Sequence, residues 1–183
     1  VSCVPTAPAQ PAQEEPIKIG GLYSLTDFLA ALGVDSHRAT EVCLEQHNYE
    51  VLGRPIEFIA EDIASSPSVC LDKTRKLVET DGVSIIAGPI LTSGADAIGP
   101  YLEQARVPYL LNSCITDEEA LSGWPVWGHA GTLNQRCYTM GQFAYDELGY
   151  RKISTLVVDY LAGHLYMEGF MKGFTDRGGQ IVQ

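Results

Sequence analysis

The sequence predicts an α/β fold in which a mostly parallel sheet is flanked by helices. Short apolar runs typical of buried strands alternate with longer stretches of helical period along most of the 183 residues. Strands that are separated by helices form right-handed βαβ units, which produce a parallel sheet. Ligands of such sheets bind beyond the carboxyl ends of the strands, so the loops at those ends are the first place to search for function.

The first part of the pattern contains two strands and two helices. Ser66 followed by Pro67 is a strong helix start, because serine caps a helix and proline suits its first position. Gly82 closes that helix. The predicted order is a strand at 17–22, a loop at 23–33, a helix from about 36 to 49, a strand at 54–60 that ends at Glu61-Asp62, and a helix at 66–82.

A third strand at 83–87 breaks at Gly88-Pro89 and is followed by a helix. Thr92 and Ser93 are its N-cap candidates, and Asp96 three residues after Ser93 approximates a capping box. Ser93 is therefore expected to cap the helix, with free backbone N–H groups nearby that suit an anionic ligand group. Pro100 predicts a kink or a split in the same helix.

The remaining elements follow the same alternation. Thr116 with Glu119, and Thr132 with Gln135, are arranged as helix starts. The stretch 122–131 has neither helical nor strand period and is expected to be a crossover. The other predicted elements are a strand at 107–111, a helix at 132–148, a strand at 152–158, a helix at about 164–177 and a strand that starts at 180.

The loops at the carboxyl edge of this sheet are predicted to form the ligand rim. A second α/β unit starts at 132, and one complete strand of it is present, which predicts that the sequence is part of a longer protein. The predicted rim consists of 23–33, 62–66, 89–93 and 112–116.

Composition narrows the functional classes. A formal charge of −11 argues against nucleic acid as a partner, because phosphate binding needs clustered lysine and arginine. No apolar run approaches the roughly 20 residues that span a bilayer. Five cysteines in a chain of this length do not indicate a disulfide framework. Cys43 and His47 share a helix face, but two ligands are too few to predict a metal site.

The N-terminal residues 1–16 form a tether rich in proline, alanine and glutamine, which cannot bury a core. Val1-Ser2-Cys3 resembles the end of a bacterial lipoprotein signal, which predicts lipidation of Cys3. A tether behind a lipid anchor would be the chain's only membrane attachment. An ordinary disordered terminus is the alternative.

Enzyme motifs are sparse in this sequence. It contains no Walker loop, no Gly-x-Ser-x-Gly elbow and no Cys-x-x-Cys pair. Glu61-Asp62 at a strand end could form a catalytic carboxylate pair, but such residues more often accept backbone hydrogen bonds in the following loop. We therefore expect no enzyme activity, no cofactor and no metal.

Four segments of the sequence together match a known family pattern. They are 17–26 with Ala30 and Gly33, 48–62, Asp81-Gly82-Val83 through Thr92-Ser93, and Tyr150 through Gly178-Gly179. In their order and spacing, rather than in one motif, they resemble the type I periplasmic binding proteins of the leucine/isoleucine/valine branch of ABC importers. The resemblance covers nearly everything from Ile17 to Gln183.

The resemblance implies two α/β lobes that close over a small ligand, with 17–128 as lobe 1 and 129–183 as the start of lobe 2. In amino-acid-binding members, the ligand carboxylate meets the third-strand turn, which corresponds to Thr92 and its neighbour Ser93. The loop after the fourth strand corresponds to Cys114 and Thr116. A side-chain pocket residue corresponds roughly to Leu32.

The sequence departs from the family pattern at the pocket walls. The usual Gly-Pro of the first loop is Asp27-Phe28, which makes Phe28 a candidate pocket residue. The aromatic residue expected before Gly163 is replaced by Ala162, and Tyr160 is its candidate substitute. The segment 159–164 is similar to members that bind aromatic carboxylates.

These residues and the resemblance favour an extracytoplasmic solute-binding receptor. It would capture an amino acid or an aromatic acid and deliver it to an ABC permease at the periplasmic or extracellular face of the cytoplasmic membrane. A ligand-sensing regulatory domain of the same fold is the first alternative. The tether behind Cys3 distinguishes the two, because a cytoplasmic sensor would have no use for it. A flavodoxin-like enzyme fragment with Asp62 as an active carboxylate is the second.

Overall fold

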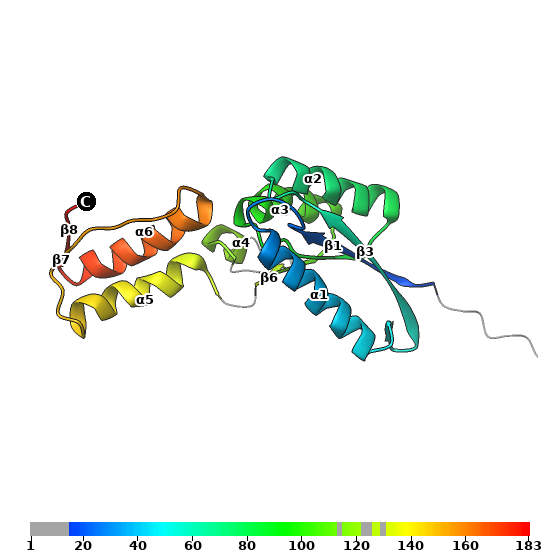
Figure 1. Cartoon of the computed structure of the whole chain (residues 1–183), viewed down its shortest axis with the longest axis horizontal. Helices are drawn as coiled ribbons and strands as arrows, with labels where there is room; N and C mark the ends of the chain where they lie inside the picture. Colours follow the sequence, from blue (N-terminus) through cyan, green and yellow to red (C-terminus); the bar gives the residue numbers. More distant parts are fainter. Residues whose placement is uncertain (1–14, 113–114, 122–125, 129–130) are drawn as a thin grey trace, which may run out of the picture.

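The computed structural model describes residues 15–112, 115–121, 126–128 and 131–183. Strands and helices alternate along these residues (Figure 1). The first elements are β1 (Ile17–Tyr23), α1 (Ala30–Gln46), β2 (Glu50–Val51), β3 (Arg54–Asp62), α2 (Pro67–Arg75), its π-helical continuation η1 (Lys76–Asp81), β4 (Ile85–Ala87), α3 (Thr92–Ala105) and β5 (Tyr109–Leu111). They are followed by α4 (Asp117–Leu121), β6 (Val126–Gly128), α5 (Leu133–Asp146), β7 (Lys152–Ile153), α6 (Leu161–Asp176) and β8 (Gln180–Ile181).

The larger sheet has the strand order β2-β3-β1-β4-β5-β6. Its neighbouring strands run parallel, except for the short antiparallel hairpin of β2 with β3. The predicted parallel sheet is therefore confirmed. The chain leaves β1 toward β3 and then returns past β1 to β4. Right-handed crossovers in these two directions place α1 on one face of the sheet and α2 and α3 on the other (Figure 1).

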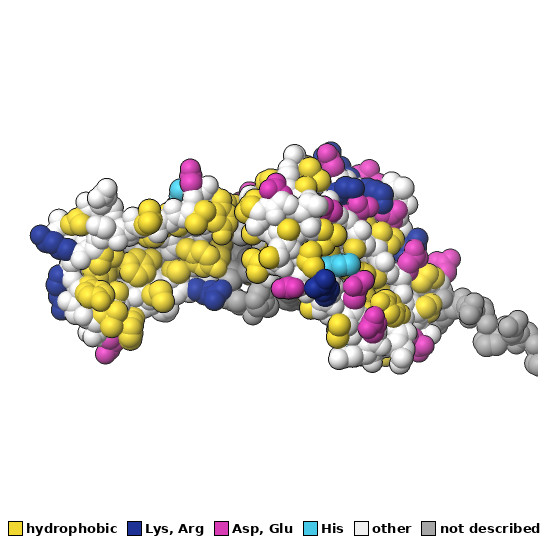
Figure 2. All heavy atoms as spheres, in the orientation of Figure 1, with side chains coloured by type: hydrophobic (Ala, Val, Ile, Leu, Met, Phe, Trp, Pro, Cys, Tyr) yellow, Lys and Arg dark blue, Asp and Glu magenta, His cyan; other side chains and the backbone are white. Residues whose placement is uncertain are grey.

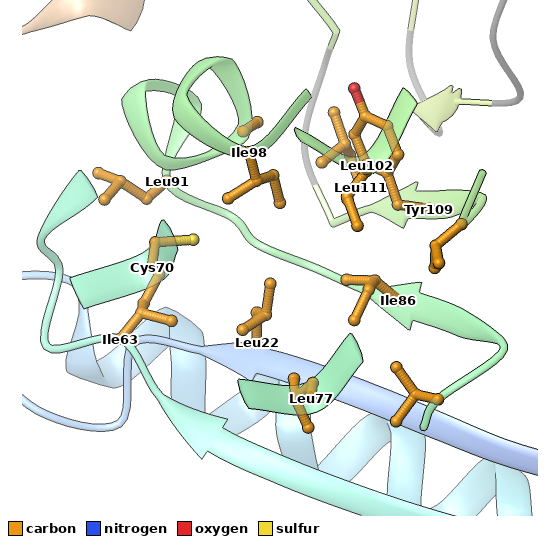
Figure 3. Packing of buried hydrophobic residues seen from close by; sticks show 13 residues of the cluster. Leu22, Ile63, Cys70, Leu77, Ile86, Leu91, Ile98, Leu102, Tyr109 and Leu111 are labelled. Carbon is orange, nitrogen blue, oxygen red and sulfur yellow. The ribbon is translucent and has the colours of Figure 1, made fainter. Parts of the chain in front are cut away.

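The hydrophobic core lies between the sheet and the pair α2 and α3 (Figure 3). Leu22 of β1 and Ile86 of β4 are fully buried and point toward these helices. Ala95, Ile98 and Leu102 lie on one face of α3 at the spacing of an amphipathic helix and are at most 1% exposed. Burial of each large aliphatic side chain contributes about 1.5–3 kcal/mol, so this layer holds the loops at the sheet edge in place.

The C-terminal elements form a helix pair beside a small parallel sheet of β7 and β8. α5 and α6 approach closely at glycines: a Cβ at Gly173 would collide with the carbonyl oxygen of Tyr138, and one at Gly141 with that of Phe170. Hydrophobic side chains gather on the visible surface of this region (Figure 2). Among the large hydrophobic side chains of α5, Met140 is 60% and Phe143 is 52% exposed.

Two helices begin earlier than predicted. α1 starts at Ala30 rather than near residue 36, because the loop before it turns at Asp27, whose φ is 70° and whose carbonyl accepts the Ala30 N–H. α6 starts at Leu161 rather than near 164. Neither start has a side-chain cap, so tertiary contacts of the preceding loops set both boundaries where sequence signals are weak.

The strand predictions contain several errors, one of which is that the short strand β2 was not predicted. The stretch 122–131 was expected to lack strand structure, but Val126–Gly128 forms β6, which pairs with β5 at Tyr109↔Val126. This strand forms by pairing with β5 at the edge of the sheet, so its sequence need not show the alternating pattern of an ordinary strand. β7 ends at Ile153, well short of the predicted 158. The predicted kink or split at Pro100 does not split α3, which is one helix from Thr92 to Ala105.

Candidate ligand-binding site

The sheet has a topological switch point between β1 and β4. These strands are hydrogen-bonded neighbours, yet the chain leaves β1 toward β3 and leaves β4 toward β5. The loops that follow them therefore diverge and leave a crevice at the carboxyl ends of the strands, where open α/β sheets bind ligands. The rim loops 23–33 and 89–93 border this crevice.

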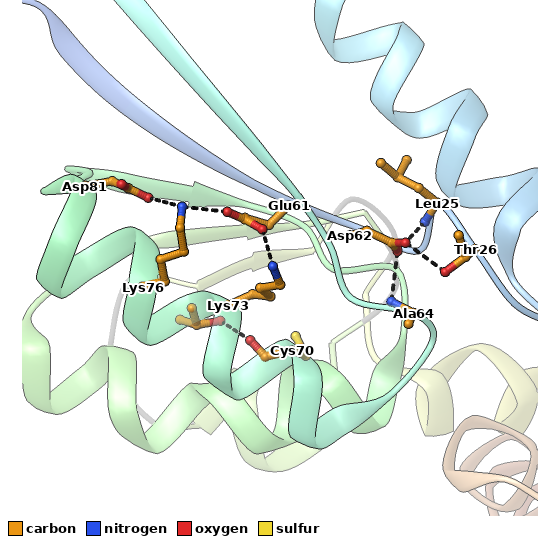
Figure 4. A network of polar contacts seen from close by, with 10 residues as sticks. Leu25, Thr26, Glu61, Asp62, Ala64, Cys70, Lys73, Lys76 and Asp81 are labelled. Carbon is orange, nitrogen blue, oxygen red and sulfur yellow. Dashed lines mark hydrogen bonds and ion pairs between the residues drawn. The ribbon is translucent and has the colours of Figure 1, made fainter.

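Asp62 fixes the loop after β1 (Figure 4). Its carboxylate accepts the Leu25 N–H at 2.9 Å, the Ala64 N–H at 2.8 Å and the Thr26 hydroxyl at 2.7 Å. Burial acts to raise the pKa of Asp62, but these hydrogen bonds outweigh burial and lower the pKa below its ordinary value. The interpretation of Asp62 as an acceptor of backbone hydrogen bonds in the adjacent loops is confirmed.

Glu61 belongs to a separate ion network between β3 and the helix formed by α2 and η1 (Figure 4). Its carboxylate oxygens lie 2.6 Å from Lys73 Nζ and 2.7 Å from Lys76 Nζ. Lys76 also contacts Asp81 at 2.9 Å. Neighbouring carboxylates thus have different tasks: Glu61 anchors the helix formed by α2 and η1, while Asp62 organises the rim.

The turn from β4 to α3 requires glycine at position 88. Gly88 has a φ of 96°, and a Cβ there would collide with the carbonyl oxygen of Leu22. Its N–H donates to the Leu110 carbonyl at 2.7 Å, which ties the turn to β5. The chain then enters α3 at Thr92, which is 4% exposed.

A cavity of about 330 Å³ lies between this edge of the sheet and the N-terminal ends of α5 and α6. A volume of this size is at the lower end of the range for small-molecule sites. Residues from both α/β parts of the chain line the cavity: Leu29, Leu32, Ile90, Leu91, Thr92, Asn112, Leu133, Arg136, Tyr160, Ala162 and Tyr166.

The amino-terminal ends of four helices contribute to this lining. Leu29, Leu91 and Tyr160 are the N-cap residues of α1, α3 and α6, and the side chains of these three residues form no cap hydrogen bond. The fourth helix, α5, is capped as predicted: the Thr132 hydroxyl accepts the Gln135 N–H at 3.2 Å. Each helix N-terminus carries a positive partial charge, so their convergence favours an anionic group in the cavity.

The described lining is largely apolar with a few polar groups. Thr92 supplies a buried hydroxyl, Asn112 an amide and Arg136 a guanidinium, while Tyr160 and Tyr166 supply aromatic rings. Such a lining suits a small molecule with an apolar body and one anionic end.

The structure brings three of the predicted ligand residues together. Leu32, Thr92 and Tyr160 all line the cavity, although they come from different elements. The rim prediction also covers Asn112, which lines the cavity from the end of β5. Their role as ligand contacts stays a prediction.

The other predicted residues lie elsewhere. Ser93 is in the first turn of α3 and does not cap it: Leu91 occupies the N-cap position, and no side chain bonds there, so the predicted capping box is wrong. Phe28 is 63% exposed and is not part of the described lining. Thr116 is 8% exposed and precedes α4, where its carbonyl accepts the Ala120 N–H. Cys114 and Cys3 lie outside the described residues.

Sequence reasoning missed Arg136 and Tyr166. Arg136 is the fourth residue of α5, one turn after the correctly predicted cap at Thr132. The predicted cap at Thr132 was a usable signal, because it showed that a helix starts directly after the predicted crossover. Side chains in the first turn of such a helix are reasonable candidates for ligand contacts. Tyr166 lies in α6, with no local signal that separates it from a packing residue. No cluster of three metal-ligating side chains occurs in the part of the chain that the structure describes.

A family model described as "Periplasmic binding protein" matches residues 16–183. The chain belongs to the periplasmic binding protein family. The predicted resemblance to type I periplasmic binding proteins is thereby confirmed, and with it the fold class.

Solved structures of this family share the fold. A solute-binding protein of an ABC transporter from Rhodopseudomonas palustris BisB5, in complex with 3,4-dihydroxybenzoic acid, is 30% identical with a TM-score of 0.84. An ABC transporter substrate-binding protein from Sphaerobacter thermophilus is 34% identical with a TM-score of 0.78. Each comparison covers 92% of this chain and 46% of the solved chain.

A curated relative is the Leu/Ile/Val-binding protein homolog 6 of Brucella abortus, which is 25% identical over 176 residues. The match covers 96% of this chain and 45% of the relative. This periplasmic binding protein sequence therefore spans about half the length of the relatives that it matches. None of its described helices is both long and apolar enough to cross a membrane.

Proposed function

We propose that this chain is part of an extracytoplasmic solute-binding receptor of an ABC importer. The receptor captures a small carboxylate-bearing molecule, an amino acid or an aromatic acid, by closure of two lobes. Residues 17–128 form the first lobe in this proposal, and 129–183 start the second. The observation that carries it is the cavity on which the N-terminal ends of α1, α3, α5 and α6 converge.

The position of the cavity supports capture by closure. Leu32 and Thr92 line it from the side of the larger sheet, and Tyr160 and Ala162 line it from α6 and the residue before it. A ligand that contacts both sides stabilises the closed arrangement by its differential affinity for that state. Closure would also remove water from around the ligand carboxylate. Its electrostatic interactions with the helix N-termini would then be stronger, because the effective dielectric constant is lower.

The relatives support both ligand classes. The solved protein from Rhodopseudomonas palustris was crystallised with an aromatic acid, and the Brucella relative is named for branched-chain amino acids. Both ligand types carry a carboxylate, which fits the Thr92 end of the cavity. The role proposed for the receptor is binding and delivery to a permease, without catalysis.

The proposed location follows from the family and the sequence. Periplasmic binding proteins act outside the cytoplasm, and lipidation of Cys3 would attach the receptor to the membrane through the tether at 1–16. Growth with labelled palmitate and a Cys3→Ser control would test the anchor: label in the wild type alone supports it, and equal labelling of both contradicts it.

A thermal-shift panel on the full-length natural protein tests the receptor proposal. The panel contains proteinogenic amino acids and hydroxylated benzoates, each at several concentrations. A true ligand at 100 times its Kd adds about 2.7 kcal/mol to the free energy of unfolding and is recovered unchanged. No stabilisation by any compound, or chemical conversion of the compound that stabilises, would overturn the proposal.

A further inference from the structure

We propose that Arg136 selects the ligand class of this cavity, and that the class is an aromatic monocarboxylate rather than a zwitterionic amino acid. The inference rests on the proposed receptor function and deepens it. It starts from the guanidinium that α5 contributes to the same cavity as Thr92.

Arg136 is the fourth residue of α5 and lines the same cavity as Thr92 of α3. Guanidinium forms paired hydrogen bonds with a carboxylate in a fixed planar geometry. Thr92 adds a buried hydroxyl at the start of α3. A carboxylate between these groups would receive donors from both α/β parts of the chain, so binding of the acid would favour their approach.

The positive electrostatic potential in the cavity disfavours the ammonium group of an amino acid. The positive ends of α1, α3, α5 and α6 meet at the cavity, and the charge of Arg136 adds to them. A simple acid meets this field with a single negative charge, whereas an amino acid must place a positive charge within the same small volume. Electrostatics therefore separates the two ligand classes that the relatives leave open.

The apolar part of the lining favours a ring. Tyr160 and Tyr166 present aromatic side chains from one end of α6, and Leu29, Leu32 and Leu133 add aliphatic surface. Aromatic rings pack on one another with an energy beyond their buried area. A ring-bearing acid uses this surface and the arginine together.

The test measures affinity by calorimetry in the full-length natural protein. The probes are 3,4-dihydroxybenzoate, its uncharged amide and L-leucine. The variants are Arg136→Gln, which removes the charge, and Arg136→Lys, which keeps the charge but loses the planar fork. Lys172→Gln is the matched control, because Lys172 is also a cation of the helix pair, contacts Asp176 and lies outside the cavity.

We expect the wild type to bind the acid at least about tenfold more tightly than the amide or leucine. Arg136→Gln should lower affinity for the acid by about 10- to 100-fold and leave affinity for the amide within about twofold, so that the preference collapses. Arg136→Lys should fall between, and Lys172→Gln should match the wild type.

Three results would overturn the inference. An unchanged preference for acid over amide in Arg136→Gln removes the selective role of Arg136, and tighter binding of leucine than of the acid contradicts the ligand class; both leave the receptor function intact. Failure of every probe and of the wider panel contradicts the receptor function itself. Melting curves of both Arg136 variants show whether lost affinity reflects lost folding.

Discussion

The carboxylate of Asp62 accepts the backbone N–H of Leu25, with 2.9 Å between Oδ1 and N. Asp62 is the last residue of β3, and Leu25 follows β1, so this bond joins two adjacent rim loops. Ser65 strengthens the junction, because its hydroxyl donates to the Thr26 carbonyl at 3.2 Å and accepts the Leu29 N–H at 3.3 Å. The junction thus holds the backbone of Leu29, which lines the cavity.

Asp62→Asn should lower the free energy of unfolding by about 1–3 kcal/mol, because it weakens charge-assisted bonds to two amides and a hydroxyl. Chemical denaturation measures this change. Asp96→Asn, at an exposed position of α3, should stay within about 0.5 kcal/mol of the wild type. Equal stability of the two variants would contradict the role of Asp62.

The stabilisation by Asp62 should depend on pH. Because folding lowers the pKa of Asp62, its contribution is present above the pKa of the unfolded chain and is lost as pH falls below about 4. The difference in unfolding free energy between wild type and Asp62→Asn should therefore be largest near neutral pH and shrink on acidification. A difference that is constant from pH 7 to 3 would exclude this linkage.

Thr92→Val in the full-length natural protein should weaken binding of the ligand found in the thermal-shift panel by about 1–3 kcal/mol. Valine keeps the shape of the buried threonine and removes its hydroxyl, so the loss reports one hydrogen bond to a charged group. Calorimetry measures the affinity, with Thr175→Val on the exposed side of α6 as the control. Unchanged affinity would remove Thr92 from the site.

Gly173→Ala should lower the free energy of unfolding by about 1–3 kcal/mol, because the new methyl group would overlap the Tyr138 carbonyl and push α6 away from α5. Glu168→Ala changes an exposed position of the same helix and should stay within about 0.5 kcal/mol. Thermal melting of both variants decides the matter: an equally stable Gly173→Ala protein would mean that the helices are not in close contact.

Glu61→Gln should lower the free energy of unfolding by about 1 kcal/mol in low salt and by less in 1 M NaCl. The reason is that its lysine partners are partly exposed, so ions in the solvent screen the pairs. Denaturation at the two salt concentrations tests this dependence. Lys172→Gln, which breaks an exposed pair within one helix, should have a smaller effect. A cost for Glu61→Gln that does not vary with salt would contradict an ion-pair role.

The contrast between Thr132 and Ser93 shows where sequence signals succeed. Both residues precede a helical pattern with a suitable partner three residues later, yet Thr132 caps α5 and Ser93 does not cap α3. The turn at Gly88 lies close to the Leu22 carbonyl and is hydrogen-bonded to the Leu110 carbonyl, and α3 starts at Thr92, one residue before the predicted cap Ser93. A capping motif in the sequence therefore predicts the first residue of a helix only where tertiary contacts do not determine that position.

The sequence by itself determined the alternation of strands and helices, the parallel sheet and the carboxyl-edge rim, because each depends on local periodicity and spacing. The family resemblance was carried separately, by matching segments in the same order along the chain. Tertiary structure alone decided that Leu32, Thr92, Arg136 and Tyr160 share one cavity. These residues are far apart in the chain, and their meeting depends on how the α5–α6 pair packs against the edge of the sheet. No local pattern encodes that packing, so the place of Arg136 in the first turns of α5 did not by itself show that it lines the cavity.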